Sequence, residues 1–119
     1  MRLPSLHEIL LPFALPLALL ATQAQAAYNL AMLKMDERQW GVAAGLLRQS
    51  LGADPGQADA QYWLGNALMG PGDATEARKA YQAALRIDSH YVQARWGFVM
   101  AQLPAIALEP HEQEASAAA

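Results

Sequence analysis

A repeat of 34 residues constrains this chain more than any other feature. When the sequence is laid over itself at this shift, identical residues meet at several positions, among them Leu30 with Leu64, Ala43 with Ala77, Leu51 with Leu85, and Asp54 with Asp88. A period of about 20 to 50 residues is typical of supersecondary units that bury their apolar faces by stacking on one another. The sequence therefore predicts a row of stacked repeat units.

Apolar residues recur at helical spacing inside each unit. Leu64 and Leu68 fall on one predicted helix of the second unit, and Tyr81 and Leu85 fall on the next. Each helix therefore carries an apolar stripe that needs a neighbour. Ala contributes much of the 54% hydrophobic content, and aromatic residues only 8%, a mixture that favours close-packed helices over strands. We predict an all-α fold with helices near residues 27–36, 39–53, 58–69, 74–87 and 90–103.

Turn signals separate the two helices of the second unit. Gly70-Pro71-Gly72 predicts a turn, and Asp73 with Glu76 three residues later is a D-x-x-E version of the capping box that starts a helix. The first unit lacks this signal, because Arg38 and Gln39 stand where the second unit has Gly and Asp. The helical hairpin is therefore marked more clearly in the second unit.

The second unit, LGNALMGPGDATEARKAYQAALRIDS, resembles the tetratricopeptide repeat family. The residues that fall at that family's spacing are Leu64-Gly65, Gly72-Asp73, Ala77, Tyr81 and Ala84-Leu85. The first unit keeps Leu30, Ala43, Leu47, Leu51 and Pro55. The resemblance covers residues 24 to 103 and implies an α-solenoid of two full repeats and a single closing helix.

The resemblance also implies a binding surface. In tetratricopeptide arrays the first helix of each unit lines a concave groove that receives an extended or helical peptide. The corresponding residues here are Tyr28, Met32 and Met35 in the first unit, Tyr62, Asn66 and Met69 in the second, and Trp96, Met100 and Leu103 in the third. Aromatic and Met side chains suit this task, since rings supply rigid contact area and Met repacks easily.

The same stripe of Tyr and Met is open to a second interpretation, in which it is simply part of the core. Against that interpretation, Leu30, Leu64 and Phe98 are expected to supply the stacking face two residues further along. Both interpretations stay open from the sequence alone.

The first 26 residues have the pattern of a signal peptide. Arg2 precedes an apolar run over residues 9–20, and Ala24-Gln25-Ala26 offers small residues for cleavage. The run is shorter than the roughly 20 residues of a spanning helix, and Pro12 and Pro16 are expected to interrupt it. We predict that residues 1–26 are removed and that the chain is exported to a bacterial periplasm. The alternative is an uncleaved segment that anchors the chain in the inner membrane.

The remaining chain divides into a repeat domain, residues 27–103, and a mobile acidic and Ala-rich tail, residues 104–119. Its composition excludes several classes of function. The net charge of −3 arises from 8 basic and 11 acidic residues without a basic block, so nucleic acid is not an expected partner. There is no Cys, the three His lack metal-ligand spacing, and no nucleophile or phosphate-loop motif occurs. We expect no catalysis, cofactor, metal or small-molecule substrate.

These features together predict a non-catalytic protein–protein interaction module, a periplasmic scaffold or assembly adaptor that binds a peptide or protein segment in an apolar groove. The alternative is a structural subunit whose last helix, with Trp96, Phe98 and Met100, lacks a covering partner. Such a subunit would complete its core by self-association or by docking on a larger envelope complex.

Overall fold

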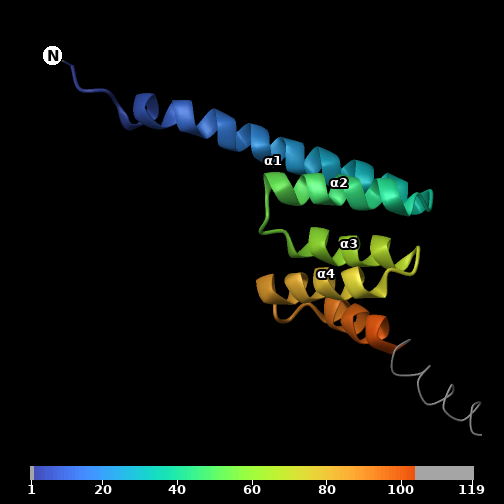
Figure 1. The fold of residues 1–119 in the computed structure, drawn as a ribbon. Coiled ribbons are helices and arrows are strands. Elements are labelled where there is room, and N and C mark those ends of the chain that lie inside the picture. Colours follow the sequence, from blue (N-terminus) through green and yellow to red (C-terminus); the bar gives the residue numbers. More distant parts are fainter. Residues whose placement is uncertain (1, 104–119) are drawn as a thin grey trace, which may run out of the picture.

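A row of antiparallel helices makes up the molecule, a computed structural model that describes residues 2–103, except for the side chains of residues 7 and 10–15. The helices are α1 (Leu6–Asp36), α2 (Trp40–Ala53), α3 (Ala58–Met69), α4 (Ala74–Ile87) and a closing helix over residues 92–103 (Figure 1). The predicted all-α class is confirmed. The predicted tail, residues 104–119, lies outside the described residues.

Four of the five predicted helices match the structure within two residues, but α1 begins 21 residues earlier than predicted, at residue 6 instead of 27. The expectation that Pro12 and Pro16 interrupt this segment is wrong, because one helix runs through both positions. Each proline removes only one backbone hydrogen bond, and the surrounding Leu and Ala are strong helix formers. A capping box between Ser5 and Glu8 starts the helix.

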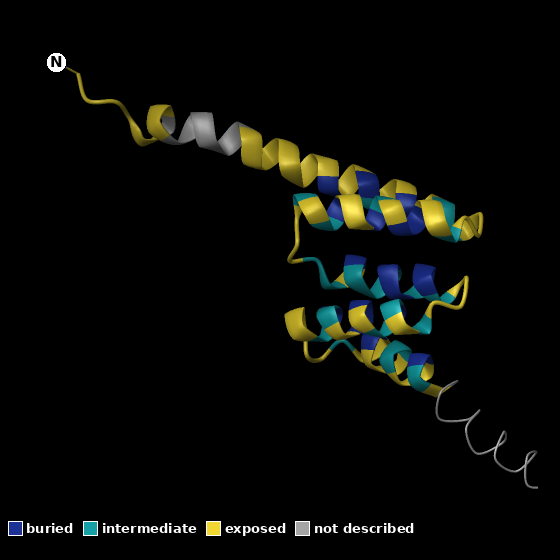
Figure 2. Ribbon diagram, viewed as in Figure 1, coloured by how far each residue is buried: buried dark blue, intermediate teal, exposed yellow. Residues whose placement is uncertain are grey.

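The first part of α1 projects beyond the other helices and is exposed where its side chains are described (Figure 2). Leu6, Leu17 and Leu19 are among its exposed apolar residues. Within the described part of the chain, no helix combines the length and the hydropathy needed to cross a membrane.

Successive helices pack as hairpins. α1 packs on α2, α3 packs on α4, and α2 joins the two pairs by packing on α3. The turn between α3 and α4 contains Gly72 with φ +89°, a conformation that glycine adopts without steric cost. At the same repeat position Arg38 has φ +58°. The turn between α1 and α2 therefore also uses a positive φ, but with Arg38 in place of a glycine. The sequence marks this turn weakly for that reason.

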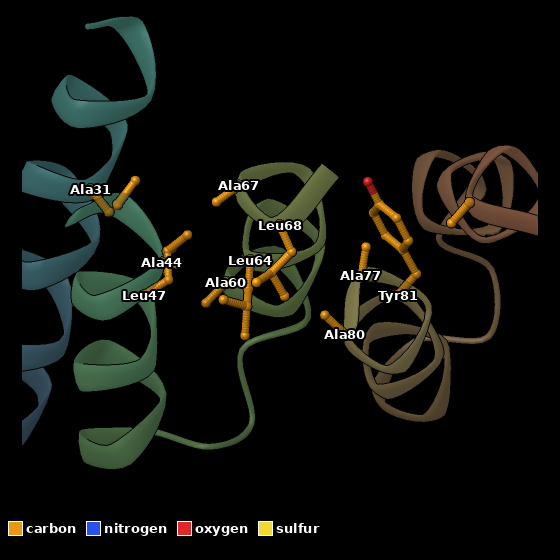
Figure 3. Packing of buried hydrophobic residues seen from close by; sticks show 12 residues of the cluster. Ala31, Ala44, Leu47, Ala60, Leu64, Ala67, Leu68, Ala77, Ala80 and Tyr81 are labelled. Carbon is orange, nitrogen blue, oxygen red and sulfur yellow. The ribbon is translucent and has the colours of Figure 1, made fainter. Parts of the chain in front are cut away.

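Alanine dominates the core and lets the helices approach closely (Figure 3). The largest hydrophobic side chains of the buried cluster are Leu47, Leu64, Leu68 and Tyr81. The predicted stacking role holds for Leu64 but is wrong for Leu30, which is 43% exposed. The reason is that α1 is the outermost helix of the described stack, so its Leu30 side has no repeat to pack against.

Ser50 ties α1 to α2 through a buried hydrogen bond. Its hydroxyl is fully buried and donates to the backbone carbonyl of Ala24 at 2.7 Å. Gln57, in the loop before α3, donates its side-chain amide to the Ser50 hydroxyl and backbone carbonyl, both at 3.0 Å. Ala24 is itself buried. The packed part of α1 therefore begins at Ala24, two residues before the predicted cleavage point.

We expect Ser50→Ala to lower the free energy of unfolding by about 1–2 kcal/mol, because it removes the buried hydrogen bond to the Ala24 carbonyl and an acceptor of the Gln57 amide. Urea unfolding followed by helical circular dichroism measures this change. Ser89→Ala is the matched control, since Ser89 is exposed and is expected to cost less than about 0.5 kcal/mol. Equal stabilities of the two variants would contradict the role assigned to Ser50.

Candidate functional site

Four aromatic residues and one carboxylate from separate parts of the chain come together at one place. This aromatic cluster consists of Tyr28 from α1, Asp59, Tyr62 and Trp63 from α3, and Tyr91 just before the closing helix. The ring of Tyr62 lies 5.2 Å from that of Trp63 and 5.2 Å from that of Tyr91, both edge-on. Such edge-to-face contacts stabilise ring pairs beyond simple burial. The cluster is therefore built from α1, α3 and the segment that leads into the closing helix.

Asp59 and the tyrosine hydroxyls interact at this cluster. Burial raises the pKa of Tyr91, and the hydrogen bond that its hydroxyl donates to the Asp59 carboxylate raises it further. Burial also raises the pKa of Tyr28, and the charge of Asp59 adds to that effect, while a hydrogen bond from the Trp63 indole N–H opposes it. Both tyrosines therefore stay protonated near neutral pH and act as hydrogen-bond donors.

An open pocket of about 370 Å³ adjoins the cluster, lined by Gln25, Tyr28, Gln57, Ala58 and Asp59. It lies between the first helices of the two repeats, because Gln25 and Tyr28 belong to α1 and Ala58 and Asp59 begin α3. A partner side chain can therefore reach the Asp59 carboxylate from solvent.

Tyr81 supports the cluster from the inside. Its side chain is 2% exposed, its ring lies 6.1 Å from that of Tyr62, and its hydroxyl donates to Asn66 Oδ1 at 2.5 Å. Burial raises the pKa of Tyr81 to about 12. A Cβ atom added at Gly65 or Gly97 would stand 2.5 or 2.6 Å from the Tyr81 ring. The ring therefore occupies space that these two glycines leave open between α3 and the closing helix (Figure 3).

A family model described as "Tetratricopeptide repeat" matches residues 28–92, more than half of the chain. The chain belongs to the tetratricopeptide repeat family. The matched region starts at Tyr28 and ends just after Tyr91, so it contains every residue of the aromatic cluster.

Solved structures support the same assignment. A mutant O-GlcNAc transferase from Thermobaculum terrenum matches with a TM-score of 0.63 and 32% sequence identity, over 66% of this chain and 15% of that chain. This chain therefore corresponds to a small part of the transferase. A search of curated proteins gave no match.

The nine residues predicted to line the groove of this tetratricopeptide module lie in four different settings. Tyr28 and Tyr62 belong to the aromatic cluster. Met32, Met35 and Met69 are partly buried and pack against the core. These three side chains therefore belong partly to the core and partly to the surface, the two interpretations that the sequence left open. The side-chain oxygen of Asn66 accepts the hydrogen bond from Tyr81. The amide N–H groups of Asn66 are the donors that it can offer to a ligand.

The three residues predicted on the closing helix are exposed. Trp96 is 67% exposed, and Met100 and Leu103 are also among the exposed apolar side chains. Among the described aromatic pairs, Tyr91 contacts Tyr62 and Trp96 does not. Trp96 therefore lies outside the ring contacts that join Tyr62 to Trp63, Tyr81 and Tyr91.

Sequence reasoning missed Asp59, Trp63 and Tyr91. A signal for Asp59 was present, because it precedes Tyr62 by three residues and such pairs share a helix face. The residues at the equivalent repeat positions are Gln25 and Gln93, so this position is polar in all three units. Tyr91 had no such signal, since its equivalents in the repeat are Gln23 and Gln57.

Proposed function

We propose that this tetratricopeptide module is a non-catalytic scaffold or assembly adaptor that binds a peptide or protein segment on the face carrying the aromatic cluster. The observation that supports this best is the cluster itself. Partly exposed rings from α1, α3 and the segment before the closing helix meet beside an open pocket, and aromatic residues are enriched where protein surfaces bind one another.

The thioethers of Met32 and Met35 on α1 and of Met69 on α3 extend this face along the helices. Met adapts its shape to different apolar partners because its side chain is unbranched and flexible. The core keeps the helices fixed, so the partner meets a preformed surface and little binding energy is spent on ordering it.

Tyr62→Ala is expected to abolish capture of a partner from a bacterial periplasmic extract, since it removes the ring that contacts both Trp63 and Tyr91. Truncating a central interface aromatic typically costs about 2 kcal/mol or more, or at least roughly 30-fold in affinity. The readout is pull-down with mass spectrometry, alongside circular dichroism to confirm helicity. Tyr62→Phe keeps the ring and should keep capture. Unchanged capture by a folded Tyr62→Ala chain would reject this face.

A second function, docking through the closing helix, is favoured by the exposure of Trp96, Val99, Met100 and Leu103 on it. Exposed apolar patches of this kind often mark an interface. In this alternative the chain is a structural subunit that associates with itself or with a larger envelope complex. Sedimentation of the full chain separates the two: a stable monomer counts against self-association.

Export to the periplasm is part of the proposal and rests on the signal-peptide pattern of residues 1–26. The buried contact between Ser50 and Ala24 favours a segment that is retained, because a cut after Ala26 would remove the carbonyl to which Ser50 donates and the pocket residue Gln25. Fractionation of bacteria expressing the full chain, followed by N-terminal sequencing, tests both points. Recovery only from the cytoplasm would reject export.

A further inference from the structure

The pocket beside the aromatic cluster has an unbalanced negative charge. Asp59 is exposed at the first turn of α3, and in the described part of the chain no basic side chain forms an ion pair with it. Lys34 on α1 is already paired, since its ammonium group lies 3.1 Å from the Glu37 carboxylate. A ligand that enters this pocket therefore meets the Asp59 carboxylate without a basic partner.

The side-chain amide N–H groups of the two glutamines that line this pocket already donate within the chain. Gln25 Nε2 donates to Asn29 Oδ1 at 2.8 Å, and Gln57 Nε2 donates to two backbone carbonyls at 3.0 and 2.8 Å. The Asp59 carboxylate lies near enough to Tyr91 to raise the pKa of its hydroxyl, and a carboxylate has room for about four hydrogen bonds. The Asp59 carboxylate therefore has room to accept hydrogen bonds from N–H donors of a ligand.

The rings around Asp59 favour a planar cation. Tyr28 lines the pocket, and Tyr91 contacts both Asp59 and the ring of Tyr62. Aromatic faces attract cations, and a guanidinium group stacks on them while forming two parallel hydrogen bonds to a carboxylate. An ammonium group is compact and strongly hydrated, so it uses these features less well.

A purely apolar partner segment would pay a penalty at this position. Covering Asp59 with apolar atoms would bury a charge that has no counter-charge, which is strongly unfavourable. An arginine placed at the pocket would remove this penalty, while neighbouring apolar residues of the same segment would contact the Tyr and Met side chains. A carboxylate ligand would be repelled.

We propose that the pocket formed by Gln25, Tyr28, Gln57 and Asp59 binds an arginine side chain of the partner segment. This inference rests on the proposed function and specifies its recognition chemistry. The occupant is not the chain's own C-terminal segment, since residues 104–119 contain three Glu and neither Lys nor Arg.

The test uses the full chain labelled with ¹⁵N and the probe peptide acetyl-Ala-Leu-Arg-Leu-Ala-amide. Matched probes replace Arg by citrulline, its uncharged isostere, or by Lys. The readout is the indole N–H signal of Trp63, which is bonded to Tyr28. The indole of Trp40 is the internal control for folding, since it packs beside Gly70, away from the cluster. We expect saturable shifts at Trp63, with binding of the citrulline probe about tenfold weaker and of the Lys probe about threefold weaker.

Asp59→Asn should erase the preference for Arg over citrulline while leaving the Trp40 signal in place. Asp36→Asn, which removes the same charge from the exposed end of α1, should keep the preference. Equal binding of the Arg and citrulline probes, equal binding of the Arg and Lys probes, or an unchanged preference in Asp59→Asn would each overturn the inference. Partner capture that depends on Tyr62 without any preference for Arg leaves the proposed function standing, whereas capture independent of Tyr62 rejects that function instead.

Discussion

Leu47→Ala is expected to lower the free energy of unfolding by about 2–5 kcal/mol, whereas Leu30→Ala should lower it by less than about 1 kcal/mol. Both leucines recur at family positions of the first repeat, and the chemical change is identical. They differ in burial, because Leu47 is 0% exposed within α2 and Leu30 is 43% exposed on α1. Truncation at Leu47 leaves a cavity in an alanine-rich core whose backbones are already close together and cannot collapse much further.

Urea and thermal unfolding, both monitored by circular dichroism, distinguish the two leucine variants. A domain of this size loses about 4–8 °C in Tm for each kcal/mol, so Leu47→Ala should melt at least roughly 10 °C below the unchanged chain. Similar decreases in the free energy of unfolding for the two variants would show that the outer side of α1 is covered in solution. That result would itself identify an interface at Leu30.

The repeat period allowed most of the fold to be predicted. α3 and α4 begin and end at the predicted residues, because Gly72 and Asp73 mark the turn between them. Asp73 accepts from the Glu76 backbone N–H as the capping pattern predicts. Glu76 itself pairs with Lys79 at 2.9 Å instead of completing the box. This pairing lowers the pKa of Glu76 through the hydrogen bond from Lys79.

The extent of α1 could not be predicted in the same way. Rules for proline describe its average cost in a helix, and Leu and Ala on either side offset that cost here. The burial of Ala24 through Ser50 depends on a contact across 26 residues of sequence. A local pattern carries no information about such a contact.

The candidate site was predicted only in part. Helical spacing and the family resemblance placed Tyr28 and Tyr62 on the first helices of their repeats, and the structure brings both into the aromatic cluster. The repeat also suggested Trp96 as their third partner, but Tyr91 makes the ring contact with Tyr62. Repeat equivalence predicts a position within a helix, whereas this contact depends on how the segment between α4 and the closing helix returns to α3.

Gly65→Ala should destabilise the fold by about 1–3 kcal/mol, while Gly45→Ala should stabilise it by about 0.5–1 kcal/mol. An added Cβ at Gly65 meets the Tyr81 ring at 2.5 Å, whereas nothing lies within 4 Å at Gly45. The ring cannot move aside freely, since it also abuts Gly97 and donates to Asn66. Urea unfolding of both variants measures whether the free energy of unfolding falls for Gly65→Ala and rises for Gly45→Ala. In a Tyr81→Leu background, which removes the ring, the cost of Gly65→Ala should fall; an unchanged cost would mean that the clash does not involve Tyr81.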